Sequence, residues 1–188
     1  MFYRMLSKML DYPDDGLQGV IWELRLHAKA GTEFEALERP LVESFLDYLE
    51  SMPLIELQSA YVQTFDLTPE HALHLTHHIF GDDKNRGPAL IDLTEFYKEY
   101  GVEMRTAAAT AAANDEPADD GKSNELPDFL PLVLEFTAML EADEARMFLS
   151  QWSKVLNVLA SNLEEASSPY APLIRLVEQR SQLVQAAA

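Results

Sequence analysis

Apolar residues recur at helical spacing along nearly the whole chain, and this periodicity constrains the fold more than any other feature. Between residues 143 and 163 they fall on one face of a single long helix, at Phe148, Trp152, Val155, Leu156, Leu159 and Leu163. Sustained alternation of apolar and polar residues, which is typical of β-strands, is nearly absent. The pattern therefore predicts an all-α protein, a single-domain bundle of about eight to nine helices.

Proline, glycine and capping residues predict where these helices end. We expect helices over about 2–10, 14–31, 32–52, 85–101, 126–140, 143–163 and 168–184, with two more between residues 53 and 81. The third helix would begin at a capping box, Thr32 to Glu35, and bury Leu37, Leu41, Phe45 and Leu49. Residues 106–124, TAAATAAANDEPADDGKSN, contain no large apolar side chain, so we expect a mobile acidic linker between helices 1–105 and 125–188.

Composition excludes several classes of function. The chain has 188 residues, 47% of them apolar, which suffices for one sizeable core. Its net charge of −18 disfavours nucleic acid and anionic membranes and would attract a basic peptide. The absence of cysteine excludes disulfides, thiolate metal sites and thiol catalysis. No leader-like segment and no apolar run of roughly 20 residues is found, so we expect a cytoplasmic protein without direct membrane insertion.

Polar residues interrupt the apolar pattern between Tyr61 and Leu93, which indicates a functional site. His71, His74 and His78 would lie at positions i, i+3 and i+7 of one helix, where their rings could converge on zinc, copper or nickel. The alternatives are hydrogen-bonded imidazoles without a ligand, or a pH-sensitive contact with a partner, since histidine changes charge near neutral pH. His77 would face a different surface.

The following turn, GDDKNRG, lacks the Gly-Lys-Ser/Thr sequence of a phosphate loop and carries two aspartates where phosphates would lie. We interpret it as a helix–helix turn, with Gly81 after the last residue of one helix and Asp82 or Asp83 capping the next. The guanidinium of Arg86 could pair there with Asp82 or Asp66 and fix the geometry of a groove. Glu135, among apolar neighbours, is either paired or exposed.

No arrangement of residues typical of catalysis is present. There is no GxSxG elbow, no GxGxxG turn, no cysteine nucleophile and no carboxylate pair set apart by its spacing. We therefore predict a protein that is not an enzyme and needs no cofactor.

Three strings in this order, YVQTFD, HLTHHIFGD and RGPALIDL, resemble the respiratory nitrate reductase assembly chaperones (the NarJ type) within the wider TorD-like family of redox-enzyme maturation proteins. The later string ELPDFLPLVLEF and the early MLDYPDD strengthen the resemblance, which covers most of the chain. His77 stands where the family commonly has tyrosine.

The resemblance implies a single-domain helical chaperone that binds the N-terminal segment of the catalytic (alpha) subunit of a nitrate reductase-like molybdoenzyme and holds this apo subunit competent for molybdenum cofactor insertion. Matching the family's motifs residue by residue implies a peptide-binding surface formed by Tyr61, Phe65, Asp66, Leu75, Thr76, His78, Gly81, Asp82, Arg86, Gly87, Leu90, Pro127, Asp128 and Glu135.

Several alternatives remain at this stage. The client could be another molybdenum oxidoreductase, the histidines could serve a metal-binding protein, or the chain could be a structural helical subunit of a larger assembly. The expected assembly is a monomer, or a dimer in which the helices after Glu125 exchange between protomers across the linker.

Overall fold

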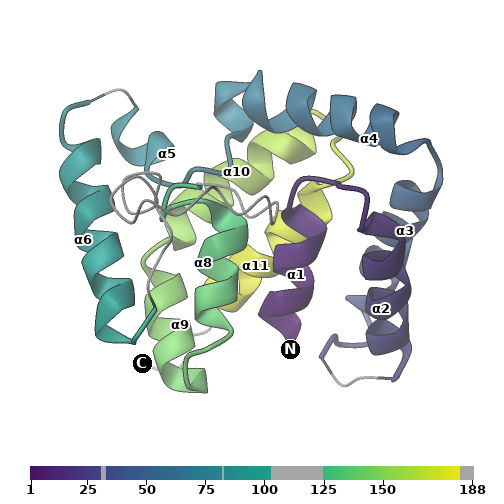
Figure 1. Ribbon diagram of the computed structural model, residues 1–188, viewed down its shortest axis with the longest axis horizontal. Helices are drawn as coiled ribbons and strands as arrows, with labels where there is room; N and C mark the ends of the chain where they lie inside the picture. The colour runs from purple at the N-terminus through teal and green to yellow at the C-terminus, as the bar shows by residue number, and fades with distance from the viewer. Residues whose placement is uncertain (31–32, 82, 103–124, 183–188) are drawn as a thin grey trace, which may run out of the picture.

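The computed structural model describes residues 1–30, 33–81, 83–102 and 125–182, and this part of the chain is built from helices (Figure 1). The α-helices are α1 (Phe2–Leu10), α2 (Leu17–Ala30), α3 (Arg39–Glu50), α4 (Leu54–Tyr61), α5 (His77–Phe80), α6 (Arg86–Glu99), α8 (Leu130–Thr137), α9 (Ala142–Ser150), α10 (Ser153–Glu165) and α11 (Ala171–Gln182). A π-helix, η1 (Val62–Asp66), continues α4, and a short 3₁₀ helix, η2 (Pro69–His71), follows it. The all-α prediction is confirmed.

The centre of the molecule is formed by α1, α8, α10 and α11. Helix α1 packs against α8, and α10 packs along α11. Figure 1 shows α2 and α3 together on one side of this centre, α6 on the opposite side and α4 across one end. In the part of the chain that is described, no helix is long and apolar enough to cross a membrane.

Two groups of aromatic rings attach the outer helices to this centre. Phe96 and Tyr97 of α6 contact Phe136 of α8 and Phe148 of α9, which fixes α6 to the bundle. A second group joins α3, α4 and η1 to Tyr170, at the start of α11, through Phe45, Tyr48, Tyr61 and Phe65. Such edge-to-face pairs add to the free energy of burying each ring.

Local sequence signals explain several helix ends. Helix α1 ends at Asp11 as predicted, because Pro13 disfavours helical geometry in the residue before it. Gly81, with φ of +54°, follows α5, and Gly101, with φ of +76°, lies just beyond α6. Both backbones lie in the left-handed region that glycine adopts without strain.

Two predictions about the helices were wrong. The predicted helix over residues 143–163 is broken at Gln151–Trp152 into α9 and α10. The break lets Phe148 join the aromatic group around α6 while α10 follows α11. Helix α3 begins only at Arg39, so Leu37 is 87% exposed and Leu41 40% exposed, and the buried positions are Val42, Phe45, Leu46 and Leu49.

The histidine-rich segment is not one helix either. His71 ends η2, His74 forms an isolated bridge with Phe129, and only His77 and His78 belong to α5. The predictions about the linker 106–124, the cap at Thr32 and the position of Asp82 lie outside the described residues.

Candidate functional site

The HLTHHIFGD and PDFLPL strings lie far apart in the sequence but meet in the fold. The backbone N–H of Leu75 donates to the carbonyl of Asp128 at 3.0 Å, and the N–H of Leu130 donates to the carbonyl of Leu73 at 2.9 Å. These two hydrogen bonds join residues 73–75 to residues 128–130 side by side. The pairing places the Thr76 and Asp128 side chains next to each other.

The Asp128 carboxylate is the centre of this junction and is 0% exposed. It accepts hydrogen bonds from the Thr76 N–H at 3.0 Å, from the Thr76 hydroxyl at 2.5 Å and from Nδ1 of His74 at 3.3 Å. The Arg86 guanidinium lies 3.8 Å from the same carboxylate, and Arg86 Nε donates to the Thr76 hydroxyl oxygen at 3.1 Å. A buried charge is tolerated only when hydrogen-bond donors or an opposite charge surround it.

Burial alone would raise the pKa of the Asp128 carboxyl, but the hydrogen bonds from His74 and Thr76 outweigh it and hold the pKa below its usual 3.8. The group is therefore ionised at neutral pH. Its hydrogen bonds are directed inward to the protein, so this carboxylate is suited to holding the junction together rather than to acting as a general acid.

Two further hydrogen bonds hold the segments on either side of the junction. The Tyr97 hydroxyl donates to the carbonyl of Pro127 at 2.8 Å, which ties α6 to the residues before α8. Nε2 of His78 donates to the carbonyl of Ala72 at 2.7 Å, which closes the turn between η2 and α5. Burial lowers the pKa of the His78 ring, so the neutral form is favoured.

Tyr61 and Phe65, from the YVQTFD string, lie elsewhere. Both are 4% exposed and belong to the aromatic group around Tyr170. The Tyr61 hydroxyl donates to the carbonyl of Leu10 at 3.0 Å, and its ring contacts Tyr12. These residues therefore support the loop between α1 and α2, while Asp66 at the end of η1 is exposed.

The remaining residues of the predicted surface divide by exposure. Leu75 is 0% exposed and belongs to the core, as does the buried Pro127. Gly81 and Leu90 are half-buried, whereas Gly87 in the first turn of α6 and Glu135 on α8 are exposed. For Glu135 this exposure decides between the two interpretations given above.

The suggested pairing of Arg86 with Asp66 was wrong, because the carboxylate that Arg86 reaches is Asp128. Asp66 lies on an exposed turn at the end of η1. The pairing with Asp128 depends on a contact between distant segments, which a single sequence does not reveal.

The histidines do not converge as the single-helix prediction required. Within residues 1–30, 33–81, 83–102 and 125–182, no three His, Asp or Glu side chains are placed to hold a metal ion. His74 instead bonds to Asp128, and its Nε2 lies 3.9 Å from Glu125.

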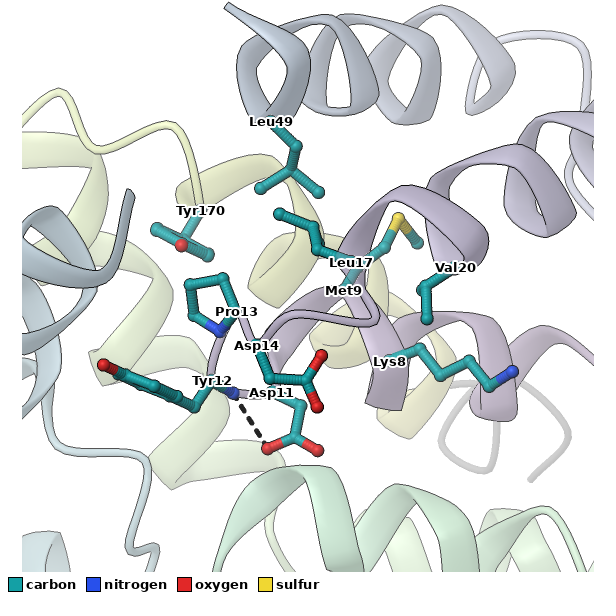
Figure 2. Close-up of a pocket in the computed structure, with 10 residues that line it drawn as sticks. All are labelled: Lys8, Met9, Asp11, Tyr12, Pro13, Asp14, Leu17, Val20, Leu49 and Tyr170. Atoms are coloured by element: carbon teal, nitrogen blue, oxygen red, sulfur yellow. Dashed lines mark hydrogen bonds between the residues drawn. The ribbon is translucent and has the colours of Figure 1, made fainter. Parts of the chain in front are cut away.

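A small cleft beside the loop between α1 and α2 was missed by sequence reasoning. It has a volume of about 90 Å³ and is lined mainly by residues of the MLDYPDD string and by Leu17, Val20, Leu49 and Tyr170 (Figure 2). The string was used only for its resemblance to relatives. A proline among three aspartates, directly before an amphipathic helix, is the sequence signal that could have indicated a loop lining a cleft.

Comparison with known proteins identifies the family of this chain. The profile of the family described as nitrate reductase delta subunit matches residues 32–175. The chain is 29% identical over 173 residues to the nitrate reductase molybdenum cofactor assembly chaperone NarJ of Escherichia coli, covering 92% of this chain and 66% of that protein. It is 28% identical over 178 residues to the probable chaperone of the same name from Bacillus subtilis, covering 93% and 85%.

A third similarity extends to a much longer protein. The chain is 31% identical over 175 residues to the nitrate reductase-like protein NarX of Mycobacterium tuberculosis, covering 93% of this chain but only 23% of that protein. The chain also spans slightly less than two thirds of the length of the Escherichia coli relatives that it matches.

Proposed function

The chain belongs to the nitrate reductase delta subunit family, and we propose that it is a system-specific chaperone for the catalytic (alpha) subunit of a nitrate reductase-like molybdoenzyme. In this role it binds the subunit before the molybdenum cofactor is inserted and keeps it competent for insertion and assembly. The similarity to the Escherichia coli and Bacillus subtilis assembly chaperones supports this proposal.

The Asp128 junction is the observation that carries the proposal. Its buried carboxylate accepts hydrogen bonds from Thr76 and His74 and lies beside Arg86. The junction therefore joins residues of the HLTHHIFGD, RGPALIDL and ELPDFLPLVLEF strings. The junction fixes the positions of α5, α6 and α8 relative to one another. A binding protein needs such a fixed surface, whereas it needs no reacting group.

We place the client's N-terminal segment on the predicted peptide-binding surface of this acidic chain. A net charge of −18 attracts a basic segment and accelerates the encounter, and a helical segment would bury its apolar face between helices. The exposed or half-buried members of the predicted surface, His78, Gly81, Arg86, Gly87, Leu90, Asp66 and Glu135, are available for contact. Leu75 would shape this surface from beneath, while Tyr61 and Phe65 support the α1–α2 loop.

The cellular role can be tested through the molybdenum content of the client. In a strain that lacks this chain, the catalytic subunit should still be made but should contain little molybdenum cofactor, and expression of the chain should restore it. A catalytic subunit with its full molybdenum content in that strain would contradict the proposal. The same measurement on the strain's other molybdenum oxidoreductases distinguishes a nitrate reductase client from another member of that class.

The placement of the site can be tested separately with Arg86→Ala. Arg86 is one partner of the buried Asp128 carboxylate, so its removal should lower the melting temperature and also displace the ends of α5 and α6. We expect the client's N-terminal peptide to bind at least several-fold more weakly. A variant that is folded at the assay temperature and binds like the parent would show that Arg86 serves folding alone.

A further inference from the structure

The cleft beside the α1–α2 loop has an apolar wall and room for one side chain. Met9, Leu17, Val20 and Leu49 supply the wall, and Pro13 covers one side (Figure 2). A volume of about 90 Å³ is far below the roughly 300–1,000 Å³ of sites that hold cofactors or drug-sized ligands. The cleft therefore fits a single extended side chain.

Two carboxylates stand at the mouth of this cleft. Asp11 accepts a hydrogen bond from the N–H of Tyr12 at 2.8 Å, and Asp14 accepts one from the N–H of Gly16 at 2.8 Å. Each of these bonds occupies one carboxylate oxygen, Oδ1, and positions the group on the loop. The cleft's own cation does not neutralise them, because Nζ of Lys8 is bound to Glu23 at 2.9 Å and points away from both aspartates (Figure 2).

The surroundings of Asp11 add further negative charge. Desolvation raises the pKa of the Asp11 carboxyl, and the negative charges of Glu135, Glu125 and Asp14 raise it further. Like charges crowded in this way are relieved by an incoming cation. Both glutamates belong to the ELPDFLPLVLEF string, so the mouth of the cleft lies near residues of that string.

Tyr170 supplies a polar group on another wall of the cleft. Its side chain is 1% exposed, and it lines the cleft from the side opposite Asp11 (Figure 2). Within the described part of the chain its hydroxyl has no hydrogen-bond partner, and it is not among the fully buried atoms that lack one, so it can be reached from the cleft. Burial also raises the pKa of this hydroxyl, so it keeps its proton and can both donate and accept.

We propose that this cleft binds one basic side chain, lysine or arginine, of the client's N-terminal segment. The aliphatic stem lies against Leu17 and Val20, and the cation reaches Asp11 and Asp14 at the mouth. The Tyr170 hydroxyl, on the opposite side of the cleft, accepts a hydrogen bond from the backbone N–H that adjoins this side chain. The inference rests on the proposed function, because the client supplies the occupant, and it adds the position and chemistry of one subsite.

The test uses a synthetic peptide with the N-terminal sequence of the catalytic subunit from the same organism, and versions in which each lysine or arginine is replaced in turn by glutamine. Binding is measured by calorimetry to the parent chain, to Asp11→Asn/Asp14→Asn and to Tyr170→Phe. Each substitution keeps the shape of the side chain. Asp143→Asn is the matched control, because Asp143 is an exposed carboxylate on α9. Melting temperatures verify that every variant is folded.

We expect the double variant to bind the parent peptide about tenfold more weakly, which corresponds to the loss of one charge-assisted hydrogen bond. Tyr170→Phe should weaken binding several-fold, and the control should bind like the parent. One glutamine peptide should bind the parent chain and the double variant equally, since its cation is the one removed. An arginine–lysine exchange at that position then shows which cation is preferred.

Each other outcome decides against a specific claim. If the parent peptide does not bind at all, both the proposed function and the cleft assignment are overturned. If it binds but the cleft variants leave its affinity unchanged, only the cleft assignment is wrong. If the variants weaken all glutamine peptides equally, or if acetylation of the peptide's amino terminus alone abolishes the effect, the occupant is not a basic side chain.

Discussion

Replacing Asp128 by asparagine should lower the free energy of unfolding by about 2–4 kcal/mol. The native carboxylate accepts hydrogen bonds from the Thr76 N–H, the Thr76 hydroxyl and the His74 ring, and it is 0% exposed. Asparagine keeps the shape but has no charge, and its NH₂ group replaces one acceptor oxygen. One charge-assisted bond, of about 1.5–3 kcal/mol, is lost, and the buried NH₂ group is left partly unmatched at a cost of about 1 kcal/mol.

The assay is urea unfolding followed by circular dichroism, with a thermal melt beside it. For a domain of this size, 1 kcal/mol corresponds to about 2–4 °C, so the melting temperature should fall by roughly 4–16 °C. Glu135→Gln is the matched control, because it removes the same charge from an exposed site on α8, and its effect should be within about 0.5 kcal/mol.

A double-mutant cycle tests the network itself. Thr76→Val removes the hydroxyl that donates to Asp128 and accepts from Arg86. Combined with Asp128→Asn, it should show a coupling energy of about 0.5–3 kcal/mol. The reasoning is refuted if Asp128→Asn is as stable as Glu135→Gln, or if the two substitutions at the junction are additive.

Three further changes have defined expectations. Tyr97→Phe should cost about 1–3 kcal/mol in urea unfolding, because the carbonyl of Pro127 loses its donor, and a cost near zero would contradict this. Leu156→Ala should cost about 2–5 kcal/mol, because the 0% exposed leucine leaves a cavity, and an unchanged unfolding midpoint would contradict this. Burial lowers the pKa of His78, so its contribution to stability is complete above the unfolded value of 6.5 and is lost as the pH falls through the lower folded pKa. In a series of melts below pH 6.5 the decline should therefore be shallower in His78→Gln, and identical slopes would contradict this.

Periodicity and stop signals predicted much of the fold because they depend on residues close in sequence. Helix α1, the start of α6 near Asn85 and the glycine that follows α5 were all predicted from such signals. The break at Trp152 was not, since the apolar stripe continues through it and only packing against two different neighbours requires the turn.

The histidine segment also shows that local spacing cannot predict contacts between residues far apart in the sequence. The spacing of His71, His74 and His78 suits a helix, but residues 73–75 pair with residues 128–130 instead. That pairing satisfies backbone groups across more than fifty intervening residues, so no local pattern contains it. The resemblance to relatives marked Thr76, Arg86 and Asp128 as important, whereas the structure shows that they contact one another.

The central claim is that this chain recognises the N-terminal segment of a molybdoenzyme's catalytic subunit. Isothermal titration of the chain with a synthetic peptide of that segment tests it most directly. The account predicts saturable one-to-one binding in roughly the nanomolar to micromolar range, with an association rate that falls as salt is raised. The absence of any heat or saturable signal with that peptide, while the chain itself is folded, would contradict the account.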